Sequence, residues 1–146
     1  MKGRDDFTLS IDVLRQTLKR GNLPSIFQIL YPSLPSENVR ERYLSALSEF
    51  AALYGSNREI ILTSAPGRTE IGGNHTDHQH GNVLAAAIDL DILCVVSPRK
   101  DKCVRLQSEG FSPIDLDLSN LSANPKDNDS AKLIRGCANW LAQHGW

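Results

Sequence analysis

The hydrophobic pattern of this chain changes near residue 58, and that change restricts the folds it can adopt. Before it, apolar residues recur every three or four positions, which predicts a helix over residues 10–20 and a longer one over residues 37–54. The apolar segment 23–31 between them is too short to classify. A final helix is predicted over residues 130–143. After residue 58, β-branched and alternating runs predict strands at 59–65, 82–88, 91–97, 103–107 and 114–118.

The connections between the predicted strands are short, which limits how the strands can pair. Parallel neighbours need a crossover of about a dozen or more residues, whereas antiparallel neighbours need only a tight turn. We therefore predict an α+β fold in which a mixed or antiparallel sheet of about five strands packs against helices. Residues 1–57 would form a helical extension, and residues 58–146 the sheet and the last helix.

Three of the predicted helices carry end signals or an apolar face. Ser10 can cap the first helix, Gly21 follows its basic end, and Gly55 ends the long helix. The long helix should bury one face, made of Val39, Tyr43, Leu47, Phe50 and Tyr54. The last helix should bury a face made of Leu133, Ile134, Cys137 and Leu141.

The composition is typical of one soluble globular domain, because 40% of the 146 residues are hydrophobic and 23% are charged. The net charge of -1 gives no reason to expect a nucleic acid or an anionic membrane as partner. No apolar run reaches the roughly 18 residues of a transmembrane helix, and the N-terminus lacks the apolar core of a signal peptide. Cys94, Cys103 and Cys137 lack C-x-x-C spacing, so we expect reduced, mostly buried thiols in a cytoplasmic protein.

Residues 66–81, between the first two predicted strands, are unusually rich in functional groups. They include three histidines, two carboxylates, an arginine and an asparagine, together with five glycine or proline residues. Connecting loops are usually shorter, about 4–6 residues. Glycine lets a backbone pass close to a ligand, and flanking strands can hold such a loop rigidly. This segment is therefore the candidate binding site.

Four kinds of segment fit this composition. The first is a plain polar surface loop. The second is a metal site, but the order His-x-Asp-His-x-His differs from the H-x-H-x-D-H pattern of metallo-hydrolases, so we expect no metal. Nucleophilic catalysis is less favoured, because the neighbouring Cys94 and Cys103 lie in strand patterns. The fourth is a carbohydrate site, since Asp, Asn and His side chains bind vicinal hydroxyls and Arg68 adds a positive charge.

The same segment resembles the galactokinase signature, G-R-x-N-x-I-G-E-H-T-D-Y-x-x-G-x-x-L-P-x-A-I. The shared positions follow in register without a gap: Gly67, Arg68, Gly73, His75, Thr76, Asp77, Gly81, Leu84, Ala87 and Ile88. The resemblance extends over about residues 58–146, whereas residues 1–57 resemble the family only loosely. Galactokinases belong to the GHMP small-molecule kinases. The resemblance therefore implies the N-terminal part of a GHMP kinase fold, which is of the ribosomal protein S5 domain 2-like type.

The resemblance also implies an activity, the ATP- and Mg-dependent phosphorylation of galactose at its anomeric hydroxyl to galactose 1-phosphate. Arg68 matches the arginine that steadies developing charge at the reacting oxygen, and Asp77 matches the aspartate that holds hydroxyls on the C3–C4 side. His75 matches a histidine of the sugar pocket, and Asn74 occupies the position that contacts the sugar near its 6-hydroxyl. Kinases act mostly by positioning and electrostatic stabilisation, which agrees with these residue types.

Several positions depart from the family pattern. Asn74 stands where the family has glutamate, Glu70 replaces asparagine, Gly72 replaces isoleucine and His78 replaces tyrosine. An amide at position 74 removes a negative charge near C6, which leaves open a related sugar such as galacturonate. It also leaves open a kinase-like protein that senses a sugar without phosphorylating it.

The family's ATP-binding features do not occur in this sequence. It has no G-x-x-x-x-G-K-[ST] motif, no Gly/Ser-rich P-x-G-x-G-L-S-S-S-A loop, and no aspartate base beyond such a loop. We therefore expect residues 1–146 to be the sugar-binding part of a longer kinase that binds no cofactor and is inactive alone. A sheet cut in this way would expose apolar surface and strand edges, so we also expect self-association.

Overall fold

The computed structural model describes residues 8–21, 24–73 and 80–145. The chain divides into two compact units, Met1–Pro98 and Arg99–Trp146. Both units combine helices with antiparallel strands, so the predicted α+β class is confirmed. The prediction of one five-stranded sheet is wrong for the described residues, because three strands pair in one sheet and two in another.

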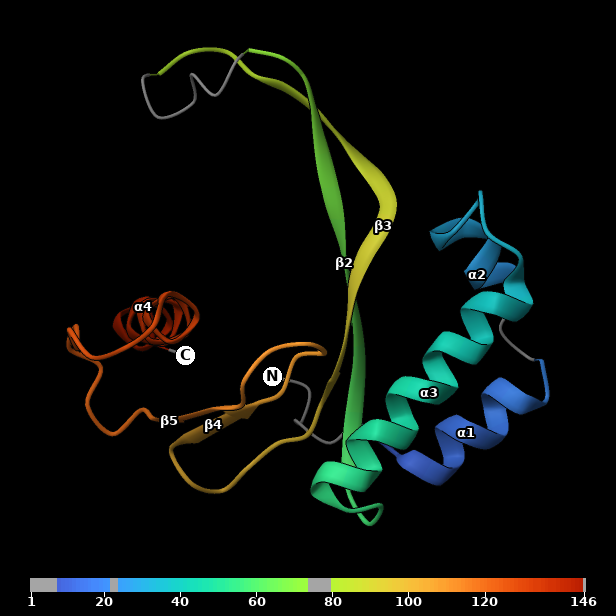
Figure 1. Ribbon diagram of the computed structural model, residues 1–146, viewed down its shortest axis with the longest axis horizontal. Coiled ribbons are helices and arrows are strands. Elements are labelled where there is room, and N and C mark those ends of the chain that lie inside the picture. The colour runs from blue at the N-terminus through green and yellow to red at the C-terminus, as the bar shows by residue number, and fades with distance from the viewer. Residues whose placement is uncertain (1–7, 22–23, 74–79, 146) are drawn as a thin grey trace. The chain divides into compact units, whose positions relative to one another are not determined.

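The first unit is built around a long antiparallel hairpin (Figure 1). Its strands are β2 (Glu59–Gly72) and β3 (Leu84–Val96), and the short strand β1 (Leu9–Ser10) pairs with β2 on the edge that β3 leaves free. All three helices of the unit lie on one side of the hairpin in Figure 1. They are α1 (Ile11–Lys19), α2 (Pro24–Leu30) and α3 (Ser36–Tyr54).

The helix boundaries follow from local chemistry that the sequence signals. Ser10 accepts a hydrogen bond from the backbone N–H of Val13 at 3.4 Å and so caps α1. The long helix α3 ends at Gly55, whose φ of 90° lies in the left-handed region that glycine adopts easily. The first and the long predicted helices are therefore confirmed, and the segment that the sequence left unclassified contains α2.

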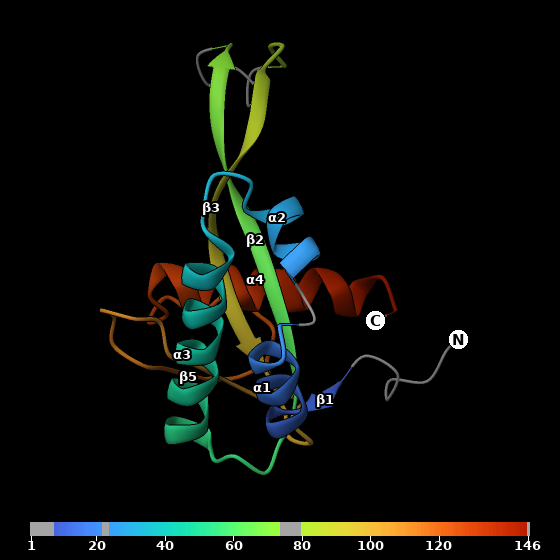
Figure 2. The same ribbon diagram turned by 90° about the vertical axis from the view of Figure 1, so that its right-hand side faces the viewer.

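The core of the first unit lies between the helices and the base of the hairpin. Figure 2, seen from the helix side, shows α1 and α3 next to each other in front of the strands. Eight residues are buried in this core, namely Ile11, Leu18, Phe27, Tyr31, Val39, Tyr43, Leu47 and Ile60. The buried residues of α3 belong to its predicted face, whereas Phe50 and Tyr54 of that face are only half-buried.

The hairpin strands are longer than the sequence predicts. Residues 82–88 and 91–97 are predicted as separate strands, but the structure has one strand, β3, that continues through the predicted break. Strand β2 likewise continues past Ala65 as far as Gly72. Both differences have the same cause, since each strand hydrogen-bonds to the other along most of its length and so stays extended.

A bulge takes up the residues that were predicted to form the break. Pro66 pairs with Asp91, and the next pair along the ladder is Arg68 with Ala87. The three residues of β3 between these pairs therefore face Gly67 alone. A Cβ on Gly67 would lie 3.1 Å from the carbonyl oxygen of Leu90, so a residue without a side chain fits best opposite the bulge.

The second unit consists of a short hairpin and one helix. Strands β4 (Cys103–Leu106) and β5 (Ile114–Asp117) pair in antiparallel fashion, and α4 spans Asp129–Gln143. The side chain of Asn128 accepts a hydrogen bond from the backbone N–H of Ala131 at 2.8 Å and caps α4.

The predicted inner face of α4 is wrong for Leu133, Cys137 and Leu141, which are exposed, whereas Ile134 is half-buried. Leu133 and Leu141 are 69% and 44% exposed, and the buried residues of the helix are Ala131 and Arg135. Arg135 sets this orientation, because its Nε donates to the buried carboxylate of Asp127 at 2.7 Å and its Nη1 donates to two backbone carbonyls. A guanidinium buried with this many acceptors turns its own side of the helix inward.

The three cysteines are unpaired. Cys94 and Cys103 are half-buried, but Cys137 is exposed, so the prediction of mostly buried thiols is wrong for Cys137. Burial raises the pKa of the Cys94 thiol, which keeps it in the unreactive protonated form. Among the helices of the described residues, none has the length and apolar character needed to cross a bilayer.

Candidate functional site

The outer part of the β2–β3 hairpin carries the predicted sugar-binding segment. We call residues 67–73 and 80–90 the arm; it extends beyond α2 in Figures 1 and 2. The bulge at Gly67 separates the arm from the part of the hairpin that packs on the helices. Ile71, Leu84 and Leu90 of the arm are each more than 60% exposed. The arm is therefore held by its own ladder of backbone hydrogen bonds rather than by a core.

Arg68 is the one predicted sugar residue whose position the structure describes. It lies on β2 directly after the bulge, opposite Ala87, and its side chain is exposed. Its guanidinium forms neither a hydrogen bond nor an ion pair with the side chains or backbone of the described residues. A guanidinium whose donors are not used in this way can bind an anionic or hydroxylated ligand.

Asn74, His75 and Asp77 lie outside the described residues. The described chain stops at Gly73 and resumes at His80, and these three residues fall between them in the sequence. Among the described residues, no group of three His, Cys, Asp or Glu side chains lies close enough to hold a metal ion.

Gly73 has a backbone conformation at the end of the arm that other residues rarely adopt. Its φ is 118°, and a Cβ would lie 2.7 Å from the carbonyl oxygen of Asn82. We expect Gly73→Ala to lower the free energy of unfolding by about 1–3 kcal/mol, since it adds both strain and a clash. Gly72→Ala is the matched control, because nothing lies within 4 Å of a Cβ there. Urea denaturation followed by circular dichroism measures both, and equal losses would contradict this account of Gly73.

A buried carboxylate joins the base of the arm to the helices. The side chain of Asp91, only 4% exposed, accepts hydrogen bonds from Tyr31 Oη and Ser64 Oγ, both at 2.6 Å. Its other oxygen pairs with Arg42 Nη1 at 2.5 Å, and Arg42 Nη2 also donates to the Asp91 carbonyl at 3.1 Å. Tyr43 Oη lies 2.9 Å from Tyr31 Oη and extends the network into the core.

The pKa values in this network follow from burial and hydrogen bonding. Burial alone would raise the pKa of Asp91, but hydrogen bonds from Ser64, Tyr31 and Arg42, with the charge of Arg42, hold it below its ordinary value. Burial and the hydrogen bond with Tyr31 raise the pKa of Tyr43. Asp91 is therefore ionised, and Tyr43 stays protonated. This cluster was not predicted from the sequence, although a charged residue inside the apolar run of β3 is a signal for a partnered carboxylate.

Asp89, two residues earlier on β3, has the opposite environment. Its Oδ2 is buried and finds no hydrogen-bond partner among the described residues. The residue lies in the bulge opposite Gly67. A buried carboxylate oxygen without a donor destabilises the fold, so Asp89 and Asp91 form a natural pair for comparison.

A family profile described as the galactokinase galactose-binding signature matches residues 48–98 of this chain. This stretch carries the galactose-binding signature of galactokinases. The resemblance predicted from the sequence is therefore confirmed for this part of the chain. The signature runs from the end of α3 through both strands of the hairpin and contains Arg68, Ser64 and Asp91. Tyr31, Arg42 and Tyr43, which complete the Asp91 network, precede the matched residues.

Curated galactokinases are similar to part of this chain. The galactokinase of Lactococcus lactis subsp. lactis is 41% identical over 69 residues, covering 47% of this chain and 17% of that protein. The human galactokinase is 40% identical over 80 residues, which cover 53% of this chain and 20% of the human protein. The galactokinase of Enterococcus faecalis is 36% identical over 102 residues, which cover 68% of this chain and 26% of that protein. The chain thus spans about a quarter or less of the length of these relatives. No solved structure matches it.

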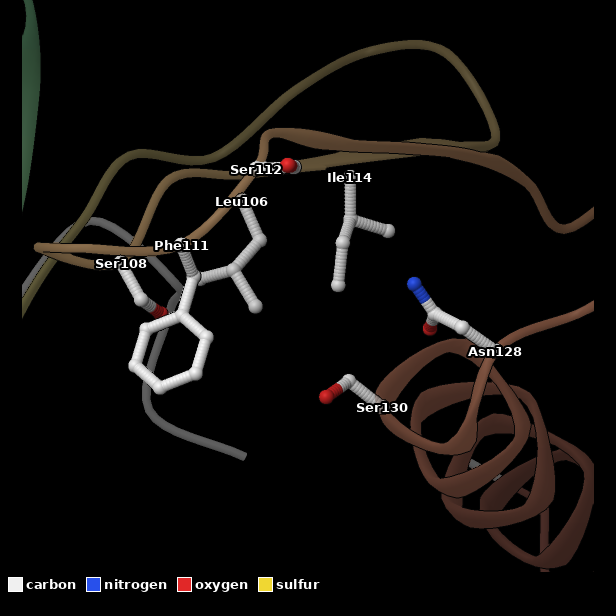
Figure 3. Close-up of a pocket in the computed structure, with 7 residues that line it drawn as sticks. All are labelled: Leu106, Ser108, Phe111, Ser112, Ile114, Asn128 and Ser130. Atoms are coloured by element: carbon white, nitrogen blue, oxygen red, sulfur yellow. The ribbon is translucent and has the colours of Figure 1, made fainter.

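The second unit has a cavity of about 400 Å³ that contains none of the predicted site residues. Figure 3 shows Leu106 and Phe111 on one side of it, with Asn128 and Ser130, from the start of α4, on the other. Asn128 already caps the helix. The signature, and with it the candidate sugar site, lies entirely in the first unit.

Proposed function

We propose that this chain forms the sugar-holding part of a galactokinase. Such an enzyme transfers the γ-phosphoryl group of ATP to the anomeric hydroxyl of galactose, forming a new O–P bond as the bond to ADP breaks. The galactose-binding signature over residues 48–98 carries the proposal. The α+β architecture with antiparallel strands is compatible with a GHMP kinase domain of the ribosomal protein S5 domain 2-like type, and we propose a cytoplasmic enzyme of that class.

Within this proposal, four residues contact the sugar or the reacting group. Asp77 accepts hydrogen bonds from neighbouring hydroxyls, because a carboxylate can bind two donors at once. His75 and Asn74 contact further hydroxyls of the sugar. Arg68 stabilises the negative charge that develops around the reacting oxygen, a role supported by its exposed guanidinium, which has no partner among the described residues.

ATP and Mg²⁺ would supply and neutralise the transferred phosphoryl group. The described residues offer no cluster of three metal-ligating side chains, and the sequence contains no phosphate-binding loop motif, so we assign no ligand of either to this chain. The chain's own contribution is the binding and orientation of the sugar. Holding an acceptor hydroxyl in line with the phosphoryl group is itself a large part of kinase catalysis.

Incubating the native protein that carries this sequence with galactose, ATP and Mg²⁺ tests the proposal. Phosphorus NMR should show a sugar 1-phosphate and ADP in equal amounts. Binding of galactose without turnover would instead favour a sugar-sensing protein. The reason to consider such a protein is Asn74, which replaces the family's glutamate. Absence of both binding and turnover would contradict the proposal.

Asn74 also allows a prediction about the choice of sugar. An amide lacks the charge that would repel a carboxylate at C6. The wild type should therefore bind both sugars, galactose and galacturonate. Asn74→Glu should weaken galacturonate binding by about tenfold or more, which is about 1.4 kcal/mol, and leave galactose binding within about threefold. Calorimetric titration with both sugars measures the two ratios. If Asn74→Glu weakened the binding of both sugars equally, or if the wild type did not bind galacturonate, residue 74 would not discriminate between substituents at C6.

A further inference from the structure

The apolar contacts between the hairpin and the helical core lie on the base side of Asp91. The hairpin residues that pack on the core are Ile60, Leu62, Leu93 and Val95, and all of them lie toward the base from the Pro66–Asp91 pair. Asp91 is thus the last point at which the strands are joined to the helices by described contacts. Through its side chain it joins β3 to α3 by Arg42, to β2 by Ser64, and to the end of α2 by Tyr31.

The ladder changes register immediately beyond this point. Pro66 faces Asp91, and Arg68, two residues later, faces Ala87 across the bulge. Gly67 packs closely against the bulge, since a Cβ there would lie 3.2 Å from Ile88 Cδ1. Only Gly67 separates Arg68 from Pro66, the residue that faces Asp91. The arm beyond it contributes no residue to the buried core of the described chain.

We propose that Asp91 is a positioning residue, which fixes the direction of the arm relative to the helices and so presents Arg68 to the ligand. The carboxylate suits this role because its two oxygens bind partners from different elements. One oxygen receives the hydroxyls of Tyr31 and Ser64, and the other receives Arg42. Bonds in three directions fix both the place and the orientation of the strand at this residue. The consequence for sugar affinity rests on the proposed function.

Residue-resolved amide hydrogen exchange in the wild type and in Asp91→Asn tests the proposal. We expect the arm amides of residues 68–70 and 85–87 to lose about tenfold more protection than the base amides of residues 61–63 and 93–95. A general loss of stability would speed exchange in both groups by the same factor. Selective loss in the arm supports positioning, whereas equal loss in both groups, or an unchanged arm, would overturn it.

Two further variants serve as a control and as a substitute for Asp91→Asn in the exchange experiment. Asp127→Asn breaks the buried pair with Arg135 in the second unit and should leave the arm-to-base ratio unchanged. If Asp91→Asn does not fold, Tyr31→Phe removes one donor to Asp91 but keeps the ring, and its arm-to-base ratio decides in the same way.

Calorimetric titration with galactose then tests the functional consequence separately. We expect Asp91→Asn to bind galactose about tenfold more weakly than the wild type, and Asp127→Asn to bind it as the wild type does. A wild type that binds no galactose would refute the proposed function, while the exchange pattern would still decide whether Asp91 positions the arm. Unchanged affinity in an Asp91→Asn protein with a loosened arm would refute the link between the two.

Discussion

Replacing Arg68 by alanine in the native protein should lower kcat for galactose phosphorylation by about 10²–10³-fold, with a much smaller change in KM. The reason is that a positive group aimed at developing charge acts mainly in the transition state, where removing one such donor typically costs about 3–4 kcal/mol. Arg68→Lys should recover only part of the rate, because a lysine keeps the charge but not the planar fork of donors. Steady-state kinetics with galactose and ATP measures all three proteins.

Arg105→Ala is the matched control for this experiment. Arg105 also lies on a strand and is exposed, but it belongs to the second unit and pairs with Asp115 at 2.9 Å across the β4–β5 hairpin. An exposed pair of this kind contributes at most about 1 kcal/mol to stability, so the variant should fold and turn over normally. If Arg68→Ala instead raised KM and left kcat unchanged, Arg68 would bind the ground state and would not stabilise the transition state.

Asp91→Asn should lower the free energy of unfolding by about 2–4 kcal/mol. The variant loses a buried charge that three donors solvate, and each charge-assisted hydrogen bond is worth about 1.5–3 kcal/mol. Breaking a fully buried ion pair would lower the free energy of unfolding more. The loss is smaller here because the Arg42 side chain is 42% exposed and can be hydrated in the variant. Urea denaturation at neutral pH measures the loss.

Asp89→Asn is the control on the same strand, with the same chemical change two residues away. Since Asp89 Oδ2 is buried without a partner in the described residues, removing its charge should be neutral or stabilising by up to about 1 kcal/mol. The two aspartates should therefore differ clearly in their effects. Similar losses for both variants would contradict the contrast between a satisfied and an unsatisfied carboxylate.

The Asp91 contribution should also depend on pH. The pKa of Asp91 in the folded protein lies below its ordinary value of 3.8, so the ionised network stabilises the fold fully above that value. As the pH falls below 3.8 through the lower pKa of the folded state, the network gains a proton and the stabilisation is lost. The stability difference between wild type and Asp91→Asn should shrink over this acidic range. A constant difference down to complete acid unfolding would show that the charge of Asp91 is not the stabilising feature.

The features that could be predicted from the sequence are those set by neighbours along the chain. Ser10 and Gly55 mark helix ends through contacts within a few residues, and the apolar spacing of α3 identifies Val39, Tyr43 and Leu47 as its inner face. The galactokinase resemblance rests on consecutive positions in one segment in the same way.

The features that were missed depend on residues far apart in the sequence. The side-chain hydrogen-bond partners of Asp91 lie 27 to 60 residues from it in the sequence. No local sequence pattern therefore predicts the network. The bulge at Gly67 depends on how two strands meet, and the sequence alone suggested a break in β3 instead. In α4 the apolar spacing predicted an inner face that includes Leu133 and Leu141, but the side of the helix that carries Arg135 is buried instead. Arg135 donates to acceptors on β5, on the loop after it and at Asp127.

Calorimetric titration of the native protein with galactose tests whether this chain forms a sugar site. We expect saturable binding of one galactose per chain, which Asp77→Asn abolishes and Arg105→Ala leaves unchanged. Asp77 is suited to this comparison because a carboxylate that holds two hydroxyls cannot be replaced by an amide without losing a charged acceptor. Saturable binding lost only in Asp77→Asn would establish the sugar site. The absence of binding heat with galactose and galacturonate, over concentrations that saturate ordinary sugar kinases, would contradict it.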